Sequence, residues 1–206
     1  MPRVKVPRKS TAVDMTAMCD VAFLLLTFFI LTATSRQPDP LDVKIPSSTV
    51  SFKVPDKDLT ILSIGHGKVF VEIIGQDVKR LALQKMGEHY GVKFSPEQVK
   101  RFGVVSSFGV PITRLGQYID MNAEQRTKSG IESGIPTTDT TSNGELHQWV
   151  LQARNAVAEL HNVPMLVSIK GDADEEYPTV RKIVDILQRQ KVNKFSLITT
   201  AEAAAK

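Results

Sequence analysis

The apolar residues of this chain form a continuous run near the N-terminus and periodic patterns after residue 59. From Met15 to Thr34, apolar residues follow one another almost without a break. A helix of twenty residues is long enough to cross a hydrocarbon core of about 30 Å. After residue 59, apolar residues alternate with polar ones or recur every three to four residues, as in strands and amphipathic helices. The sequence therefore predicts one membrane-spanning helix followed by a folded domain.

The periodic region begins with a predicted β-hairpin. Two β-branched runs, 59–64 and 69–74, flank a Gly-His-Gly turn that supplies glycine for positive φ, with His66 at its centre. Four elements close the domain: a helical stripe at 146–160 with Trp149 at its border, a strand at 164–169, a helix after Pro178 and a strand at 194–199. Strands that alternate with amphipathic helices predict an α+β fold, in which helices cover one face of a two-layer α/β domain.

Residues 75–143 form a predicted helical insertion between the hairpin and these closing elements. Apolar spacing at 78–86, a Ser95-Pro96 pair and Pro111 indicate three helices. Residues 127–144 are rich in Ser, Thr and Gly, which predicts a mobile loop. Because the elements outside the insertion have complete apolar patterns of their own, we expect the insertion to be dispensable for the fold of the domain.

The segment between the span and the hairpin is a predicted linker. It contains four prolines, and only residues 41–45 alternate like a strand. The predicted organisation is an N-terminal tail at 1–12, a transmembrane helix at 13–34, an extended linker at 35–58, an α/β domain at 59–199 with the insertion at about 75–143, and a C-terminal tail at 200–206.

Asp20 is the one ionisable acid or base between Met15 and Thr34. A central aspartate disfavours membrane insertion by roughly 2.5–3.5 kcal/mol, whereas each large apolar residue favours it by roughly 0.3–0.6 kcal/mol. Such an acid is a candidate proton or ion relay that faces protein or a water-filled path. Thr16 and Thr27 lie on the same helical face and flank the carboxyl. The alternative is an acid near the helix end that snorkels to the headgroups.

The charges on the two sides of the span are asymmetric. After the span, Arg36 is followed by two acids, whereas four basic residues precede the span: Arg3, Lys5, Arg8 and Lys9. The positive-inside rule therefore predicts a single-pass membrane protein, with its N-terminus in the cytoplasm and its C-terminal domain outside. A cleaved signal peptide is the alternative. Asp14 and Asp20 fit it poorly, because signal peptides seldom carry acids on the approach to the apolar core.

The sequence lacks the patterns typical of enzymes. It contains no Gly-rich phosphate loop, no Cys or His spacing for a metal and no nucleophile elbow, so we expect neither catalysis nor a cofactor. The acids at 172–176 precede a helix whose dipole they complement, which we favour over a cation site. A net charge of +4 without a concentrated basic face argues against nucleic-acid binding. These absences favour a binding module.

The segment Asp14-Met-Thr-Ala-Met-Cys-Asp20-Val, followed by the apolar run, is a distinctive motif. It resembles the membrane motif of the ExbD/TolR family, the single-span subunits of the proton-driven Ton and Tol systems. Thr16 and Asp20 match that motif. Asp14 stands where Asn is common in the family, and Ala17 where Pro is common.

The resemblance continues after the span. Val43, Ile45 and Pro46 match the family's linker motif, and residues 169–199 resemble its closing strand-helix-strand. The insertion has no counterpart in the short members of the family.

The resemblance implies a homodimer in the inner membrane, with its C-terminal domain in the periplasm and its two spans inside a ring of an ExbB- or TolQ-like polytopic membrane protein. Asp20 would carry protons from the outer side inward, and the periplasmic domain would pass the motion to a TonB- or TolA-like partner. Such a complex energises transport of substrates across the outer membrane. The alternative function is a non-conducting membrane anchor that presents a periplasmic binding domain.

Overall fold

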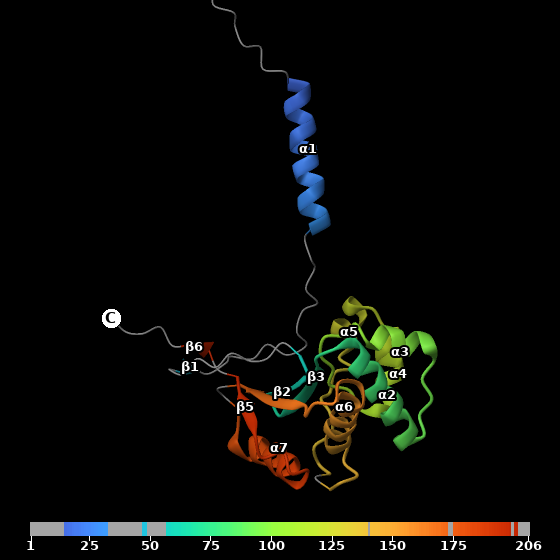
Figure 1. Cartoon of the computed structure of the whole chain (residues 1–206), viewed down its shortest axis with the longest axis vertical. Helices are drawn as coiled ribbons and strands as arrows, with labels where there is room; N and C mark the ends of the chain where they lie inside the picture. Colours follow the sequence, from blue (N-terminus) through green and yellow to red (C-terminus); the bar gives the residue numbers. More distant parts are fainter. Residues whose placement is uncertain are drawn as a thin grey trace, which may run out of the picture. The chain divides into compact units, whose positions relative to one another are not determined.

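The computed structural model describes residues 15–32, 47–48, 57–139, 141–172, 175–198 and 200–201. The chain divides into two compact units, residues 1–37 and 38–206. The described part of the first unit is one helix, α1 (Met15–Thr32), and residues 57–198 of the second unit contain the folded region that we call the α/β domain (Figure 1).

Helix α1 is apolar on every side. All of its side chains are exposed except that of Thr27, which is half-buried. Its eighteen residues span about 27 Å. With a mean hydropathy of 2.0, the helix is long and apolar enough to cross a membrane. Such a surface is stable in lipid or against other apolar helices, as the predicted span requires.

The α/β domain is built on a four-stranded mixed sheet. Its strands are β2 (Leu59–Gly65), β3 (Lys68–Ile73), β4 (Leu166–Gly171) and β5 (Phe195–Leu197), in the order β3-β2-β4-β5 (Figure 1). β2 pairs antiparallel with β3 and parallel with β4, which pairs parallel with β5. The turn has φ of 52° at His66 and 71° at Gly67, as a type I′ hairpin requires. The predicted hairpin, with His66 in its turn, is confirmed.

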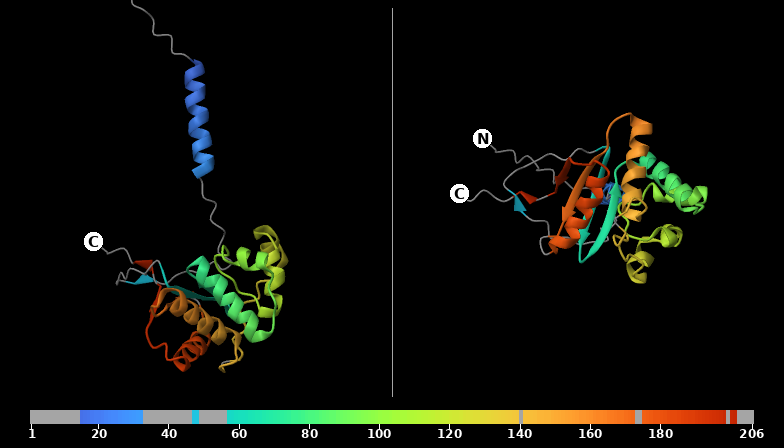
Figure 2. Two further views of the ribbon diagram at one scale, coloured as in Figure 1. Left: turned by 45° about the vertical axis from the view of Figure 1, so that its right-hand side comes forward. Right: turned by 90° about the horizontal axis from the view of Figure 1, so that it is seen from below.

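Helices α6 (Glu145–His161) and α7 (Tyr177–Arg189) lie against one face of the sheet (Figures 1 and 2). The strands present alternate residues to that face, so Leu62 and Ile64 of β2 are fully buried. Ile183 of α7 and Val150 of α6 belong to the same core. The predicted α+β class, with one N-terminal apolar helix, is therefore confirmed.

The described residues of the insertion contain four helices, one more than predicted. They are α2 (Gln76–Tyr90), α3 (Pro96–Phe102), α4 (Ile112–Asp120) and α5 (Ala123–Ser129). At the start of α3 the Ser95 hydroxyl accepts from the Gln98 N–H, and the Gln98 side chain accepts from the Ser95 N–H. The same reciprocal capping by Asn122 and Gln125 starts α5. The prediction of a loop from residue 127 is therefore wrong at its start.

The segment after α5 also differs from a mobile loop. Ile135 is buried, and its N–H donates to the Val69 carbonyl at 2.8 Å. The Gly134 N–H donates to the Gly109 carbonyl at 2.8 Å. Gly109 in turn lies so close to the Phe70 ring that a Cβ there would clash with it. This segment therefore packs along the outer edge of β3.

The insertion contributes to the core, which overturns the basis for calling it dispensable. Trp149, predicted at the border of its stripe, is fully buried. The Phe102 ring stacks on it with centroids 5.9 Å apart, and the Phe108 ring meets it edge-on at 4.7 Å. The Val71 N–H also donates to the Phe108 carbonyl at 2.8 Å. Helix α6 therefore needs the insertion to cover the face that carries Trp149.

Two short strands complete the described residues. β1 (Ser47–Ser48) pairs in parallel with β6 (Thr200–Ala201). The predicted strand at 41–45, with the motif residues Val43, Ile45 and Pro46, lies outside the described residues. So do the ends of the predicted span, at 13–14 and 33–34.

Candidate functional site

Asp20 lies in the second turn of α1, with its side chain exposed. Along the helix axis, Thr16 is about 6 Å from it and Thr27 about 10 Å. The Thr27 hydroxyl donates to the Leu24 carbonyl at 2.9 Å, which leaves its oxygen able to accept a hydrogen bond. Thr16 is therefore the neighbour of Asp20 in the adjoining turn, whereas Thr27 is too distant to contact it. The polar face is a line of positions that other helices can contact, and its role stays a prediction.

The hairpin turn forms a small acidic cavity with the start of α7. The cavity of about 260 Å³ is lined by His66, Gly67, Asp172, Glu175, Glu176 and Thr179. The Gly67 N–H donates to the Glu175 carboxylate at 3.1 Å, and Glu176 is the N-cap residue of α7. A carboxylate at the N-terminus of a helix fits the expected dipole interaction. The bond between Glu175 and the turn is a contact that the sequence pattern does not indicate.

A wider groove lies on the insertion, between the second half of α2 and the segment that leads into α3. Its volume is about 880 Å³, and Val92, Phe94 and Val99 contribute apolar surface. Gln84, Glu88 and Lys93 supply polar groups of mixed charge. The groove has space for a ligand or a side chain but no convergent set of charges.

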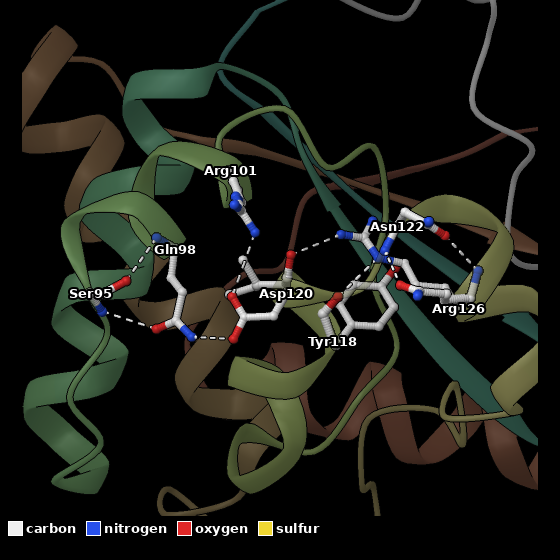
Figure 3. Close-up of polar contacts among 9 residues, drawn as sticks. Ser95, Gln98, Arg101, Tyr118, Asp120, Asn122 and Arg126 are labelled. Carbon is white, nitrogen blue, oxygen red and sulfur yellow. Dashed lines mark hydrogen bonds and ion pairs between the residues drawn. The ribbon is translucent and has the colours of Figure 1, made fainter.

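The helices of the insertion are joined by polar side chains (Figure 3). The Gln98 amide of α3 donates to the Asp120 carboxylate at 2.9 Å, and Arg101 forms an ion pair with Asp120 at 3.8 Å. The Arg126 guanidinium lies 4.3 Å from the centroid of the Tyr118 ring. These contacts hold α3, α4 and α5 together.

The Tyr118 hydroxyl is part of the same arrangement and is shielded from water. It donates to the Glu132 carboxylate at 2.9 Å. Burial, and then the neighbouring Glu132 charge, raises the pKa of Tyr118 well above its usual value. A phenol held in its neutral form suits a structural hydrogen bond better than acid-base chemistry.

The end of α6 carries the third polar cluster, which sequence reasoning missed. The two ring nitrogens of His161 contact different carboxylates: Nδ1 contacts Asp58, and Nε2 lies 3.2 Å from Asp77 Oδ2. Hydrogen bonds to Asp58 and then Asp77 raise the pKa of His161 above its ordinary value. A histidine in the last turn of a helix is a visible signal. Its acidic partners lie 103 and 84 residues away in the chain, so no local sequence pattern predicts these contacts.

Across the part of the chain that the structure describes, no group of three or more His, Cys, Asp or Glu residues is arranged to hold a metal ion. In the His161 cluster both ring nitrogens already face carboxylates. The polar clusters described above make hydrogen bonds and ion pairs within the α/β domain, and Asp20 is the candidate for chemistry in α1.

Comparison with known proteins identifies the family. The family model described as biopolymer transport protein ExbD/TolR matches residues 7–202. No curated protein and no solved structure matches the chain. Because the match covers nearly the whole chain, α1 and the α/β domain included, the chain belongs to the ExbD/TolR family of biopolymer transport proteins.

Proposed function

We propose that this ExbD/TolR family member is the single-span subunit of a proton-driven complex in the inner membrane, with Asp20 as the proton carrier. One observation carries the proposal: the family match includes an apolar helix, Met15–Thr32, whose only acidic or basic residue is Asp20. A carboxyl group kept in an apolar span is expensive to insert and is typically retained for proton or ion movement.

The carboxyl can couple proton transfer to motion because its two forms prefer different surroundings. Low-dielectric surroundings favour the neutral acid, whereas water or a polar neighbour favours the carboxylate. A helix that alternates between the two environments takes up a proton on one side and releases it on the other. One charge moved through 100 mV supplies about 2.3 kcal/mol, so a mechanical step that needs more free energy than this would require several protons.

The exposed apolar surface of α1 supports a partner in the membrane. A single helix has no interior in which to shelter Asp20, so other helices or water must face it. We propose that two copies of α1 sit within an ExbB- or TolQ-like polytopic protein, with Thr16 and Thr27 on the contact face. The α/β domain would then act on a TonB- or TolA-like protein to support transport across the outer membrane. This is a role in energy transduction and not in catalysis.

The proposed orientation rests on the basic residues before the span. The N-terminus is cytoplasmic and the α/β domain is periplasmic. A cysteine in place of Ser142, whose side chain is exposed, tests this in a Cys19→Ser background. We expect an impermeant maleimide to label it in intact spheroplasts. Labelling that requires membrane lysis would reverse the orientation.

Substitution of Asp20 tests the proton role. Asp20→Asn keeps the shape and hydrogen-bonding capacity but cannot carry a proton, so we expect loss of energy-dependent uptake with the complex still assembled. Asp20→Glu keeps the proton and moves the carboxyl by one methylene, so partial activity indicates that chemistry outweighs position. Cys19→Ser, one residue away and turned about 100° around the helix, is the matched control and retains activity. Wild-type uptake in assembled Asp20→Asn would favour the alternative function, a non-conducting anchor.

A further inference from the structure

His161 joins three parts of the α/β domain that are distant in the sequence. It is the last residue of α6, Asp58 directly precedes β2, and Asp77 lies in the first turn of α2. The ring reaches Asp58 through Nδ1 and Asp77 through Nε2, the latter at 3.2 Å. The imidazole therefore lies between two carboxylates on two separate elements.

Both aspartates also take part in backbone hydrogen bonds, Asp77 through its carboxylate and Asp58 through its main-chain carbonyl. Asp77 Oδ1 accepts from the Val78 N–H at 2.9 Å, at a helix start where Gly75 offers no side-chain cap. The Asp58 carbonyl accepts from the Leu166 N–H at 2.8 Å, which joins the start of β2 to the start of β4. A change at His161 can therefore alter how the chain enters the sheet and how α2 begins.

The protonation state of the imidazole decides how many of these contacts it can make. Ionised carboxylates only accept hydrogen bonds, and only the imidazolium form donates from both ring nitrogens. The neutral ring donates from one nitrogen and turns a lone pair toward the other carboxylate. Loss of one proton therefore replaces one of the two attractive contacts with a repulsive one.

Solvent can reach the cluster. The His161 side chain is 35% exposed, and a cavity of about 310 Å³ adjoins it. Lys57, Asp58, Asp77 and His161 are the charged and titratable residues that line this cavity, and Ile74 and Gly75 are its other lining residues. The ring can therefore exchange protons with bulk water without unfolding of the domain.

We propose that His161, Asp58 and Asp77 form a pH-sensitive clasp that fastens the segment leading from the linker to α2 and α6 when the imidazole is doubly protonated. The clasp loosens when the ring loses one proton. This proposal goes beyond the role of Asp20 and does not depend on it. It assigns to the α/β domain its own response to the pH of the surrounding compartment.

The electrostatics give the direction of the response. Hydrogen bonds to Asp58 and then Asp77 raise the pKa of His161, and these outweigh the opposing effect of desolvation. The clasp is therefore closed in acid and opens as the pH rises through the raised pKa of His161.

Histidine titration in the full chain, held in detergent micelles, tests the first step. The four histidines are labelled with ¹³C at Cε1, and the His161 signal is identified by its loss in His161→Gln. We expect a lower pKa for His161 in both Asp58→Asn and Asp77→Asn than in the wild type. Asparagine suits residue 58, whose φ is 54°. Glu159→Gln, which removes an acid of α6 that pairs with Lys85, is the matched control and leaves the titration unchanged.

Hydrogen exchange tests the second step. After correction for intrinsic rates, we expect the Leu166 and Val78 amides to open about two- to fivefold more often above the pKa of His161 than below it, because one hydrogen bond is lost. The Val71 amide, bonded to Phe108, is the internal control. In His161→Gln the pH dependence disappears. The proposal would be overturned if the pKa of His161 were the same in the wild type and in both Asn variants. It would also be overturned if the exchange of the Leu166 and Val78 amides, corrected for intrinsic rates, did not change with pH.

Discussion

The two units of this chain place their large apolar side chains in opposite ways. In α1, Phe23 is 63% exposed and Phe28 is 59% exposed, and no residue of the helix is buried. In the α/β domain, Phe108 is 1% exposed and Trp149 is fully buried. The same residue types thus complete a core in one unit and form an outer surface in the other.

Polar groups differ in the same way. The hydroxyls of Thr27 and Thr32 bond to carbonyls of their own helix, as is common where water is absent. In the α/β domain, side chains such as Gln98 and His161 bond across helices and strands. The domain thus holds itself together through its own contacts, whereas α1 depends on what surrounds it. Substitutions in the two units should therefore affect different measurements.

The largest expected effect is the loss of the fold when the insertion is removed. Replacing residues 76–142 by a short Gly/Ser linker strips Trp149 of Phe102 and Phe108 and exposes the outer edge of β3. We expect cooperative unfolding of the α/β domain to disappear. The measurement is urea denaturation of the full chain in micelles, followed by fluorescence of Trp149, the only tryptophan. Cooperative unfolding with an unchanged midpoint would show that the insertion is a separate appendage.

Glu124→Ala is the control for that deletion. It changes an exposed residue within the same segment. Surface substitutions away from special features usually change stability by less than about 0.5 kcal/mol. Its transition should therefore overlay that of the wild type.

A matched pair of phenylalanine substitutions compares the units directly. Phe108→Ala leaves a cavity beside Trp149 and should lower the free energy of unfolding by about 3–5 kcal/mol. Phe28→Ala makes the same chemical change on the exposed surface of α1 and should leave the unfolding of the domain within about 0.5 kcal/mol of wild type. Its effect should instead appear as weaker copurification of the proposed membrane partner. Equal destabilisation of the domain by both variants would contradict the claim that Phe108 belongs to the core of the domain and Phe28 does not.

The sequence predicted what local chemistry determines. The His66-Gly67 turn and the start of α3 at Ser95 depend on neighbours within a few residues, and both are confirmed. The capping pair Asn122 and Gln125 was equally local, but the polar composition of residues 127–144 concealed it.

Contacts between distant segments could not be predicted in this way. Trp149 lies beside the apolar stripe of its helix. It is buried because the rings of Phe102 and Phe108, which belong to the insertion, pack against it. The clasp at His161 depends on two carboxylates from distant segments, and the periodicity of apolar residues cannot predict that they lie close together. For Asp20 the reverse holds: the sequence alone identifies the candidate residue, and the partner that we propose for it belongs to another chain.

The smallest expected effect is the pH dependence of domain stability, because two histidines act in opposite directions. Hydrogen bonds to Asp58 and Asp77 raise the pKa of His161, so its stabilisation is fully present below the unfolded value of about 6.5 and is lost as the pH rises through the folded value. Burial lowers the pKa of His147, so protonation in acid destabilises the fold.

Urea midpoints between pH 5 and 9 separate the two histidines. The difference between wild type and His161→Gln should be largest at the acidic end and vanish at the basic end. A difference that grows with pH would contradict the assignment.

Proton flux through the assembled complex tests most directly the claim that the work of this protein is done at Asp20. The chain and the polytopic protein that copurifies with it are placed in liposomes with an internal pH dye, and a potassium diffusion potential drives protons inward. We expect flux for the wild type and for Cys19→Ser, and for Asp20→Asn only the rate of liposomes that contain the partner alone. Wild-type flux through an assembled Asp20→Asn complex would contradict the account.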